Sequence, residues 1–93
     1  MADEYAQRCD EFFAWLEELL DEHAGVADYE SNGQICEITC TGGSQIVINR
    51  QPANQEIWLA AKSGGFHFRH DGTDWIDTRD GKPFGERLEE CLQ

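Results

Sequence analysis

The chain of 93 residues is long enough for one domain and too short for two hydrophobic cores. Its 19 acidic residues against 7 lysines and arginines give a formal net charge of -12, which argues against nucleic-acid binding and favours cations or basic protein surfaces as partners. No stretch approaches the roughly 18 apolar residues of a membrane span, and Asp3 and Glu4 stand where a secretory signal would be basic. We therefore expect a cytoplasmic protein without membrane contact.

Residues 4–23 are predicted to form a long amphipathic helix, because apolar residues recur at helical spacing. The apolar arc is Tyr5, Cys9, Phe12, Phe13, Leu16, Leu19 and Leu20. The opposite arc is acidic and holds Asp3, Glu4, Asp10, Glu11, Glu17, Glu18, Asp21 and Glu22. Gly25 follows as a stop signal for the helix. One face of this helix is therefore expected in the core and the other in water.

From about residue 26 the apolar period changes to two, and turn signals such as Asn32-Gly33 and Asp71-Gly72 recur at short intervals. Strands are predicted at 26–31, 35–41, 44–50, 55–61, 66–70 and 74–78, and a second helix at 83–92. The short connections favour an antiparallel meander. We predict one α+β domain over residues 1–93, a two-layer α/β sandwich in which both helices cover one face of a six-stranded sheet.

Alternation along the predicted strands divides their side chains between the two faces of the sheet. The set predicted to face the helices is Ile46, Ile48, Ile57, Leu59, Phe66 and Phe68. The set predicted to face solvent is Val47, Asn49, Trp58, Ala60, His67 and Arg69.

The four cysteines stand at positions 9, 36, 40 and 91 without a C-x-x-C pair, so their spacing does not fit a common zinc site. Cys36, Ile38 and Cys40 alternate on one face of a predicted strand, which favours buried apolar roles. Asp71, Asp74, Asp77 and Asp80 recur every three residues, a spacing that favours turns and sheet edges over a calcium loop. No nucleophile or phosphate-binding motif occurs, so no catalytic site is predicted.

The acids are concentrated at the N-terminal end of the chain, where residues 1–30 hold ten acids and one base, Arg8, a net charge of −9. Glu18, Asp21 and Glu22 stand at i, i+3 and i+4 and are therefore expected on one helix face. One interpretation is a solvated face that keeps the protein soluble. Like charges at this spacing cost roughly 0.2–0.5 kcal/mol each and no lysine offsets them, which favours a functional interpretation.

Asp28 and Glu30 alternate outward on the next predicted strand and can extend this acidic patch. Oxygen ligands in a shallow, open arrangement suit hard cations bound weakly, such as Fe³⁺, Fe²⁺, Mn²⁺ or Ca²⁺. The patch is therefore a candidate metal site as well as a candidate surface for a basic partner.

Trp58 is a large aromatic residue that the alternation places on the solvent face of the sheet. Asn49, Gln51 and His67, from flanking strands, are expected around it. Tryptophan is enriched at interface hot spots, so the alternatives are an isolated exposed aromatic residue and an anchor for a protein partner.

Four stretches within residues 44–77 form a distinctive series: SQIVINRQ at 44–51, QEIWLA at 55–60, GGFHF at 64–68 and DWID at 74–77. The pattern I-x-I-N-[KR]-Q followed by Q-x-[IV]-W-L is typical of the frataxin family. The chain resembles the bacterial branch of that family over nearly its whole length. The resemblance implies the same two-layer sandwich that the periodicity predicts.

The resemblance also implies weak binding of ferrous and ferric iron, or of other divalent cations, and a role as a regulator of iron–sulfur cluster assembly. The implied iron ligands are Glu17, Glu18, Asp21, Glu22, Asp28 and Glu30, and the implied partner surface is Asn49, Gln51 and Trp58 with the neighbouring His67. The expected partners are the cysteine desulfurase and the cluster scaffold protein. We expect a monomer unless iron promotes oligomers. The alternatives are an acidic adaptor without a metal role and, less favoured, a ferroxidase.

Overall fold

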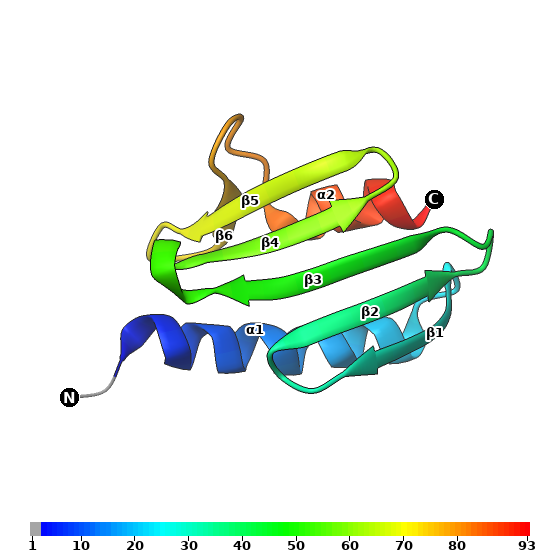
Figure 1. The fold of residues 1–93 in the computed structure, drawn as a ribbon, viewed down its shortest axis with the longest axis horizontal. Helices are drawn as coiled ribbons and strands as arrows, with labels where there is room; N and C mark the ends of the chain where they lie inside the picture. Colours follow the sequence, from blue (N-terminus) through cyan, green and yellow to red (C-terminus); the bar gives the residue numbers. More distant parts are fainter. Residues whose placement is uncertain (1–2) are drawn as a thin grey trace.

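The computed structural model describes residues 3–93 and has an N-terminal helix, six strands and a C-terminal helix (Figure 1). The elements are α1 (Glu4–Glu22), β1 (Val26–Ser31), β2 (Ile35–Cys40), β3 (Gln45–Gln51), a 3₁₀ turn η1 (Pro52–Asn54), β4 (Glu56–Ala61), β5 (Gly64–His70), β6 (Trp75–Asp77) and α2 (Phe84–Leu92). The predicted α+β architecture is confirmed, and the element ends differ from the predicted ones by no more than two residues. No helix within residues 3–93 has the length and apolar character needed to cross a membrane.

Helix α1 begins at an N-terminal cap and buries one stripe of side chains. The Asp3 carboxylate accepts hydrogen bonds from the backbone N–H groups of Tyr5 (3.0 Å) and Ala6 (3.4 Å), which satisfies donors that the first turn leaves free. The buried stripe is Tyr5, Cys9, Phe12, Phe13, Leu16 and Leu20. Leu19 packs against the core but stays partly exposed, so the predicted apolar arc is confirmed except at its margin.

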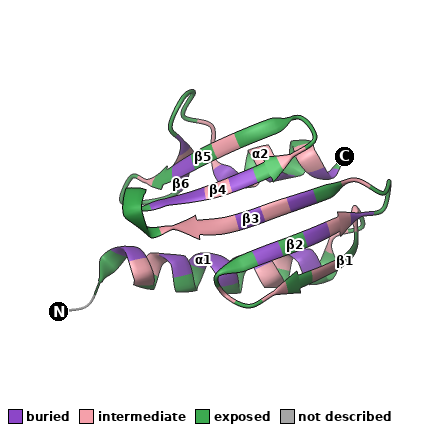
Figure 2. Cartoon of the chain, in the orientation of Figure 1, coloured by how far each residue is buried: buried purple, intermediate pink, exposed green. Residues whose placement is uncertain are grey.

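The sheet is an antiparallel meander in the order β1-β2-β3-β4-β5-β6. Figure 1 shows both helices on the same face, with α1 toward the β1 side and α2 toward the β6 side. The middle of the sheet is buried and the strand ends and outer helix faces are exposed (Figure 2). The register pairs Ile48 with Leu59 and Ile57 with Phe68, which confirms the predicted inward face.

Phe66 lies at the margin of that inward face and is only partly buried. The guanidinium carbons of Arg79 and Arg87 lie 5.6 Å and 4.5 Å from its ring centroid. These two cations cover the ring where the helix layer ends, so the residue packs at the boundary of the core.

All four cysteines are free thiols, and Cys9, Cys36 and Cys40 are buried. Burial raises the pKa of Cys36 to about 11. Because the thiolate is the form that binds metal, such a thiol is a poor ligand. The predicted role of the Cys36–Cys40 stretch as core is confirmed.

The aspartates from Asp71 to Asp80 hold turns together. The Asp71 carboxylate accepts hydrogen bonds from the backbone N–H groups of Thr73 and Asp74, both at 2.9 Å. These backbone donors lower the pKa of Asp71. Asp80 accepts from the Lys82 N–H at 2.9 Å and from Arg87, and the same donors lower its pKa. The predicted turn role is confirmed.

Candidate functional site

The acidic edge formed by α1 and β1 holds two of its carboxylates in place from the neighbouring strand. Ser31 donates from its hydroxyl to Glu17 (2.7 Å), and Tyr29 donates from its hydroxyl to Asp21 (2.6 Å). The hydrogen bond to Asp21 raises the pKa of Tyr29 to about 12. Glu17 and Asp21 therefore point toward β1 and have fixed positions.

Glu18 and Glu22 lie further round the same helix and are both exposed. They stand four residues apart, so their carboxylates are neighbours on the helix surface. Among residues 3–93, no ion pair includes any of the six predicted ridge carboxylates. We call the helix part of this surface the acidic ridge: Glu17, Glu18, Asp21 and Glu22. No ion pair of the described residues therefore neutralises its negative charge.

Asp28 and Glu30 lie on the opposite side of β1 from the acidic ridge. Tyr29 and Ser31, which alternate with them, face α1, so these two carboxylates point away from the helix on the outer face of the sheet. The sequence analysis predicted that these two residues extend the acidic patch of the helix. In the structure they belong to the same edge of the sheet but face away from α1. The register places Glu30 directly opposite Glu37 of β2.

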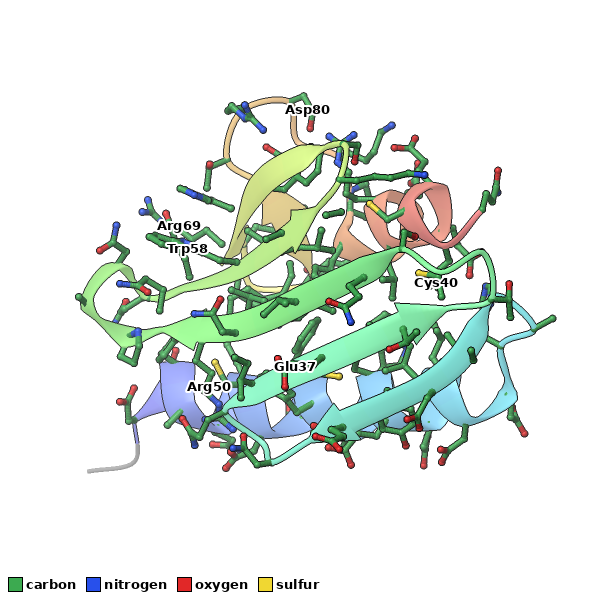
Figure 3. All side chains as sticks on the ribbon, turned by 45° about the vertical axis from the view of Figure 1, so that its right-hand side comes forward. Glu37, Cys40, Arg50, Trp58, Arg69 and Asp80 are labelled. Carbon is green, nitrogen blue, oxygen red and sulfur yellow. The ribbon has the colours of Figure 1, made fainter. Side chains whose placement is uncertain are left out.

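Glu37 is an acid of this outer face that the sequence prediction missed. It projects outward from β2 in Figure 3 and lines, with Asp28 and Glu30, a shallow hollow of about 200 Å³. Its place between the buried Cys36 and Ile38 was the available signal, because alternation puts it on the solvent face.

The acidic surfaces fit weak cation binding better than a closed metal cage. Within the described residues 3–93, no three His, Cys, Asp or Glu side chains are close enough together to hold a metal ion as they stand. The donors of the acidic ridge are carboxylate oxygens, which suit hard cations such as Fe²⁺, Fe³⁺ and Ca²⁺. A cation bound by these exposed carboxylates would keep several of its waters.

The second surface surrounds Trp58 on the outer face of β3, β4 and β5. The register pairs Trp58 with Asn49 on one side and with His67 on the other. The rings of Trp58 and His67 stack with centroids 4.3 Å apart and an interplanar angle of 9°. Gln51, the fourth predicted residue, pairs with Glu56 next to them. The structure therefore brings the predicted partner-binding residues together, and we call this surface the Trp58 pad.

Glu56 is the residue of the Trp58 pad that the sequence prediction missed. Its carboxylate accepts hydrogen bonds from the Trp58 indole N–H (2.8 Å) and from Arg69 (2.9 Å), and Nδ1 of His67 lies 3.7 Å away. The residue is only 5% exposed although it lies on the outer face. Figure 3 shows why, since Trp58 and Arg69 lie side by side over this part of the sheet.

Strand alternation places Glu56 on the outer face of the sheet. It is buried there because the side chains of Trp58 on β4 and Arg69 on β5 cover it. Because its N–H is already bonded, Trp58 presents the rest of its indole to a partner in a fixed orientation.

Helix α1 supports the corner of the sheet next to this pad. The Tyr5 hydroxyl donates to the backbone oxygen of Glu56 (2.7 Å) and accepts from the Gln51 N–H (3.1 Å). Burial raises the pKa of Tyr5. Arg50, between Asn49 and Gln51, points instead to the helix, where it pairs with Asp10 at 2.7 Å. These contacts hold β3 and β4 rigidly where the pad residues begin.

The chain is similar to known proteins over its full length. A family model described as Frataxin-like domain matches residues 1–93. The chain is 38% identical to the iron-sulfur cluster assembly protein CyaY of Neisseria meningitidis, over 96% of this chain and 83% of that protein. It is 42% identical to the protein of the same name from Vibrio vulnificus, over 95% of this chain and 86% of that protein.

Solved structures show the same fold. The frataxin of Psychromonas ingrahamii matches with a TM-score of 0.85 and 29% identity, over 96% of this chain and 85% of that chain. The trimeric frataxin of Saccharomyces cerevisiae, complexed with ferrous iron, matches with a TM-score of 0.71 and 32% identity, over 97% of this chain and 83% of that chain.

Proposed function

The chain belongs to the frataxin family, and we propose that it takes part in iron–sulfur cluster assembly as an iron-binding regulator of the cysteine desulfurase. Relatives from two bacteria, about 40% identical, bear the name iron-sulfur cluster assembly protein, and that name does not denote an enzyme. We therefore assign it a binding role and place it in the cytoplasm with its partners.

The observation that supports this proposal most directly is the unpaired charge of the acidic ridge. Glu18 and Glu22 are exposed neighbours that form no ion pair within residues 3–93, next to Glu17 and Asp21, which β1 holds in place. Such a surface attracts Fe²⁺ and Fe³⁺ as hydrated ions and binds them weakly. The yeast relative was solved in complex with ferrous iron, which supports iron over other divalent cations as the ligand of this chain.

The two surfaces have different partners in this proposal. The acidic ridge meets a basic surface of the desulfurase, so that association is fast and depends on salt. The Trp58 pad, on the outer face of the sheet, contacts the cluster scaffold protein through a preformed aromatic surface. Cation binding to the ridge would reduce its charge and so alter its affinity for the desulfurase, which makes the regulation responsive to iron.

A second candidate function is an acidic adaptor whose ridge contacts a basic partner without a metal. The observation that favours it is the lack, within residues 3–93, of three ligands already close enough together to hold a metal ion.

Anaerobic isothermal titration with Fe²⁺ separates the two functions. The parent should bind Fe²⁺ weakly, and Glu18→Gln/Glu22→Gln should lose most of the heat because these two carboxylates are unpaired. Asp71→Asn is the matched control, since its carboxylate belongs to a turn. If the parent gives no heat but binds a bacterial cysteine desulfurase, the adaptor function is correct. If it binds neither, the proposal is wrong.

A further inference from the structure

Helices α1 and α2 and the start of β6 enclose an apolar groove of about 620 Å³ that neither proposed surface includes. Its apolar lining is Phe12, Trp15, Trp75, Pro83, Phe84 and Gly85. Trp15 is 42% exposed and is one of two exposed large apolar residues among residues 3–93. The volume lies within the range of sites that accept a ligand or a partner side chain, roughly 300–1,000 Å³.

Gly85 of α2 lines the groove directly beside Trp15. A Cβ atom at Gly85 would approach only the Trp15 ring, at 3.9 Å, which is an ordinary contact. The ring of Trp15 packs beside Phe12 and Phe84, with centroids 5.8 Å and 6.3 Å away. One side of the indole is therefore supported by the core and the other faces the open groove.

The rim of the groove is negatively charged. Asp74 and Glu86 line it directly. Glu11 and Glu18 stand four residues before and three residues after Trp15, so they flank it on the same face of α1. No ion pair within residues 3–93 includes any of these four carboxylates.

The cations nearest to the groove along the chain already have partners. Arg8 pairs with Glu4 at 3.4 Å, and Lys82 pairs with Glu90. Arg87 pairs with aspartates on the other side of α2. The groove therefore combines an apolar floor with carboxylates that no cation within the described part of the chain neutralises.

We propose that this groove docks one aliphatic or aromatic side chain of a lysine- and arginine-rich segment that belongs to the protein partner of the acidic ridge. The inference rests on the proposed function, because Glu18 belongs both to the ridge and to the rim, which makes the two surfaces continuous. The ridge then attracts the basic segment, and the groove slows its release. A second copy of this chain is an unfavourable occupant, since each copy carries a net charge of -12.

The test uses two synthetic peptides of equal charge, acetyl-KKFLKK-amide and acetyl-KKSSKK-amide, titrated into the full chain at low salt. The chain has three tryptophans, so its ¹H–¹⁵N spectrum holds three indole signals. We expect the Phe-Leu peptide to bind about tenfold tighter and to shift the Trp15 indole signal, because burial of an apolar anchor adds to the electrostatic attraction.

Two variants remove the groove in opposite ways. Trp15→Ser deletes its exposed wall, while Gly85→Leu fills it and leaves Trp15 present; both should abolish the preference for the Phe-Leu peptide. Ile35→Ser, a substitution of the other exposed large apolar residue, on β2, is the matched control and should retain it. Thermal melting of each variant establishes that it is folded.

The inference is wrong if the two peptides bind equally, if neither binds, or if the preference survives in both groove variants. It is also wrong if sedimentation shows that the parent self-associates through Trp15, because the occupant is then a second copy. If the two peptides bind equally and Glu18→Gln/Glu22→Gln weakens the binding of both, the ridge proposal is supported and the groove proposal is wrong. A peptide preference that depends on Trp15, without any binding to the desulfurase, would support the groove and contradict the proposed function.

Discussion

The acidic ridge and the Trp58 pad use carboxylates in opposite ways. Within residues 3–93, no ion pair includes any of the four carboxylates of the ridge, and Glu18 and Glu22 are exposed. The pad has one carboxylate, Glu56, which is buried and bonded to the Trp58 indole and to Arg69. The ridge thus carries exposed negative charge that our proposal assigns to a cation or a basic partner, whereas the carboxylate of the pad already has its hydrogen-bond donors within the fold.

This difference has an energetic counterpart. Like charges on an exposed helix face repel by a few tenths of a kcal/mol per pair, so the ridge costs little stability although its carboxylates lie close together. A buried carboxylate without partners would cost several kcal/mol, so Glu56 requires its donors and in turn fixes Trp58. An exposed charged surface suits weak, adaptable binding, and a buried, bonded one suits a contact of defined geometry.

The largest expected effect is on partner binding through the pad. Trp58→Ala should weaken binding of the cluster scaffold protein by about 2 kcal/mol or more, roughly thirtyfold, because a preoriented tryptophan is typical of a hot spot. The melting temperature should fall only slightly, because loss of the partly exposed Trp58 ring opens Glu56 to water, which can replace the indole N–H as a donor. Isothermal titration and thermal melting measure both. A large loss of stability with unchanged binding would make Trp58 a structural residue.

The next effect concerns Glu56 and tests whether the pad is preorganised. Glu56→Ala removes the acceptor of the Trp58 and Arg69 hydrogen bonds and should lower the free energy of unfolding by about 1–2 kcal/mol, a value reduced because Arg69 is largely exposed. Glu56→Gln, which can still accept the indole N–H, should lose less. Urea denaturation gives the stabilities. If both variants bind the scaffold as the parent does, preorganisation by Glu56 is excluded.

Removal of carboxylates from the ridge should raise the free energy of unfolding, whereas removal of Glu56 from the pad should lower it. Glu18→Gln/Asp21→Asn/Glu22→Gln should raise the stability by about 1 kcal/mol at low salt, because several repulsions of a few tenths of a kcal/mol disappear. Sodium chloride should stabilise the parent by screening, and MnCl₂ or anaerobic FeCl₂ should do so at much lower concentration. Melting series on the parent and the variant measure this. A variant that keeps the full response to divalent ions would show that these carboxylates are not the site.

Reversal of the ridge charge should affect the rate of association with a partner more than the contacts within the complex. Glu18→Lys/Asp21→Lys should slow association with the desulfurase and flatten its salt dependence, while the dissociation rate changes less. Biolayer interferometry over a range of salt concentrations resolves the two rates. Asp71→Lys, outside the ridge, is a control for charge reversal that changes the net charge by two units where the ridge variant changes it by four. Equal association rates for the ridge variant and the parent at low salt would remove the electrostatic basis of the proposal.

The smallest expected effect is a change in the ionisation of Tyr29, whose hydroxyl lies at the edge of the ridge. The hydrogen bond to Asp21 raises the pKa of Tyr29 from 10.0 to about 12 in the folded protein. Stability from this bond is therefore complete below pH 10 and is lost as the pH rises from 10 to about 12. Tyrosinate absorbance should show Tyr29 ionising at lower pH in Asp21→Asn, and Tyr29→Phe identifies its signal against Tyr5. An unchanged titration would mean that Asp21 does not hold Tyr29.

Periodicity determined which elements form and which way most side chains face. The changes between helical and strand spacing located α1, the six strands and α2, and alternation placed Trp58 and His67 outward beside each other. These features are local or depend on the pairing of neighbouring strands, and short turns leave such strands little choice of partner. The cysteines of β2 followed the same rule and are buried.

Tertiary structure alone decided how the charges are used. An outward position says nothing about whether Glu56 is exposed, because its burial depends on Trp58 and Arg69 closing over it. Helical spacing grouped Asp21 with Glu18 and Glu22, but it could not show that the Tyr29 hydroxyl of β1 donates a hydrogen bond to Asp21. The groove beside Trp15 exists only where α2 brings Gly85 against α1. Burial and pairing are properties of neighbours brought together by the fold, so a pattern along one chain segment cannot contain them.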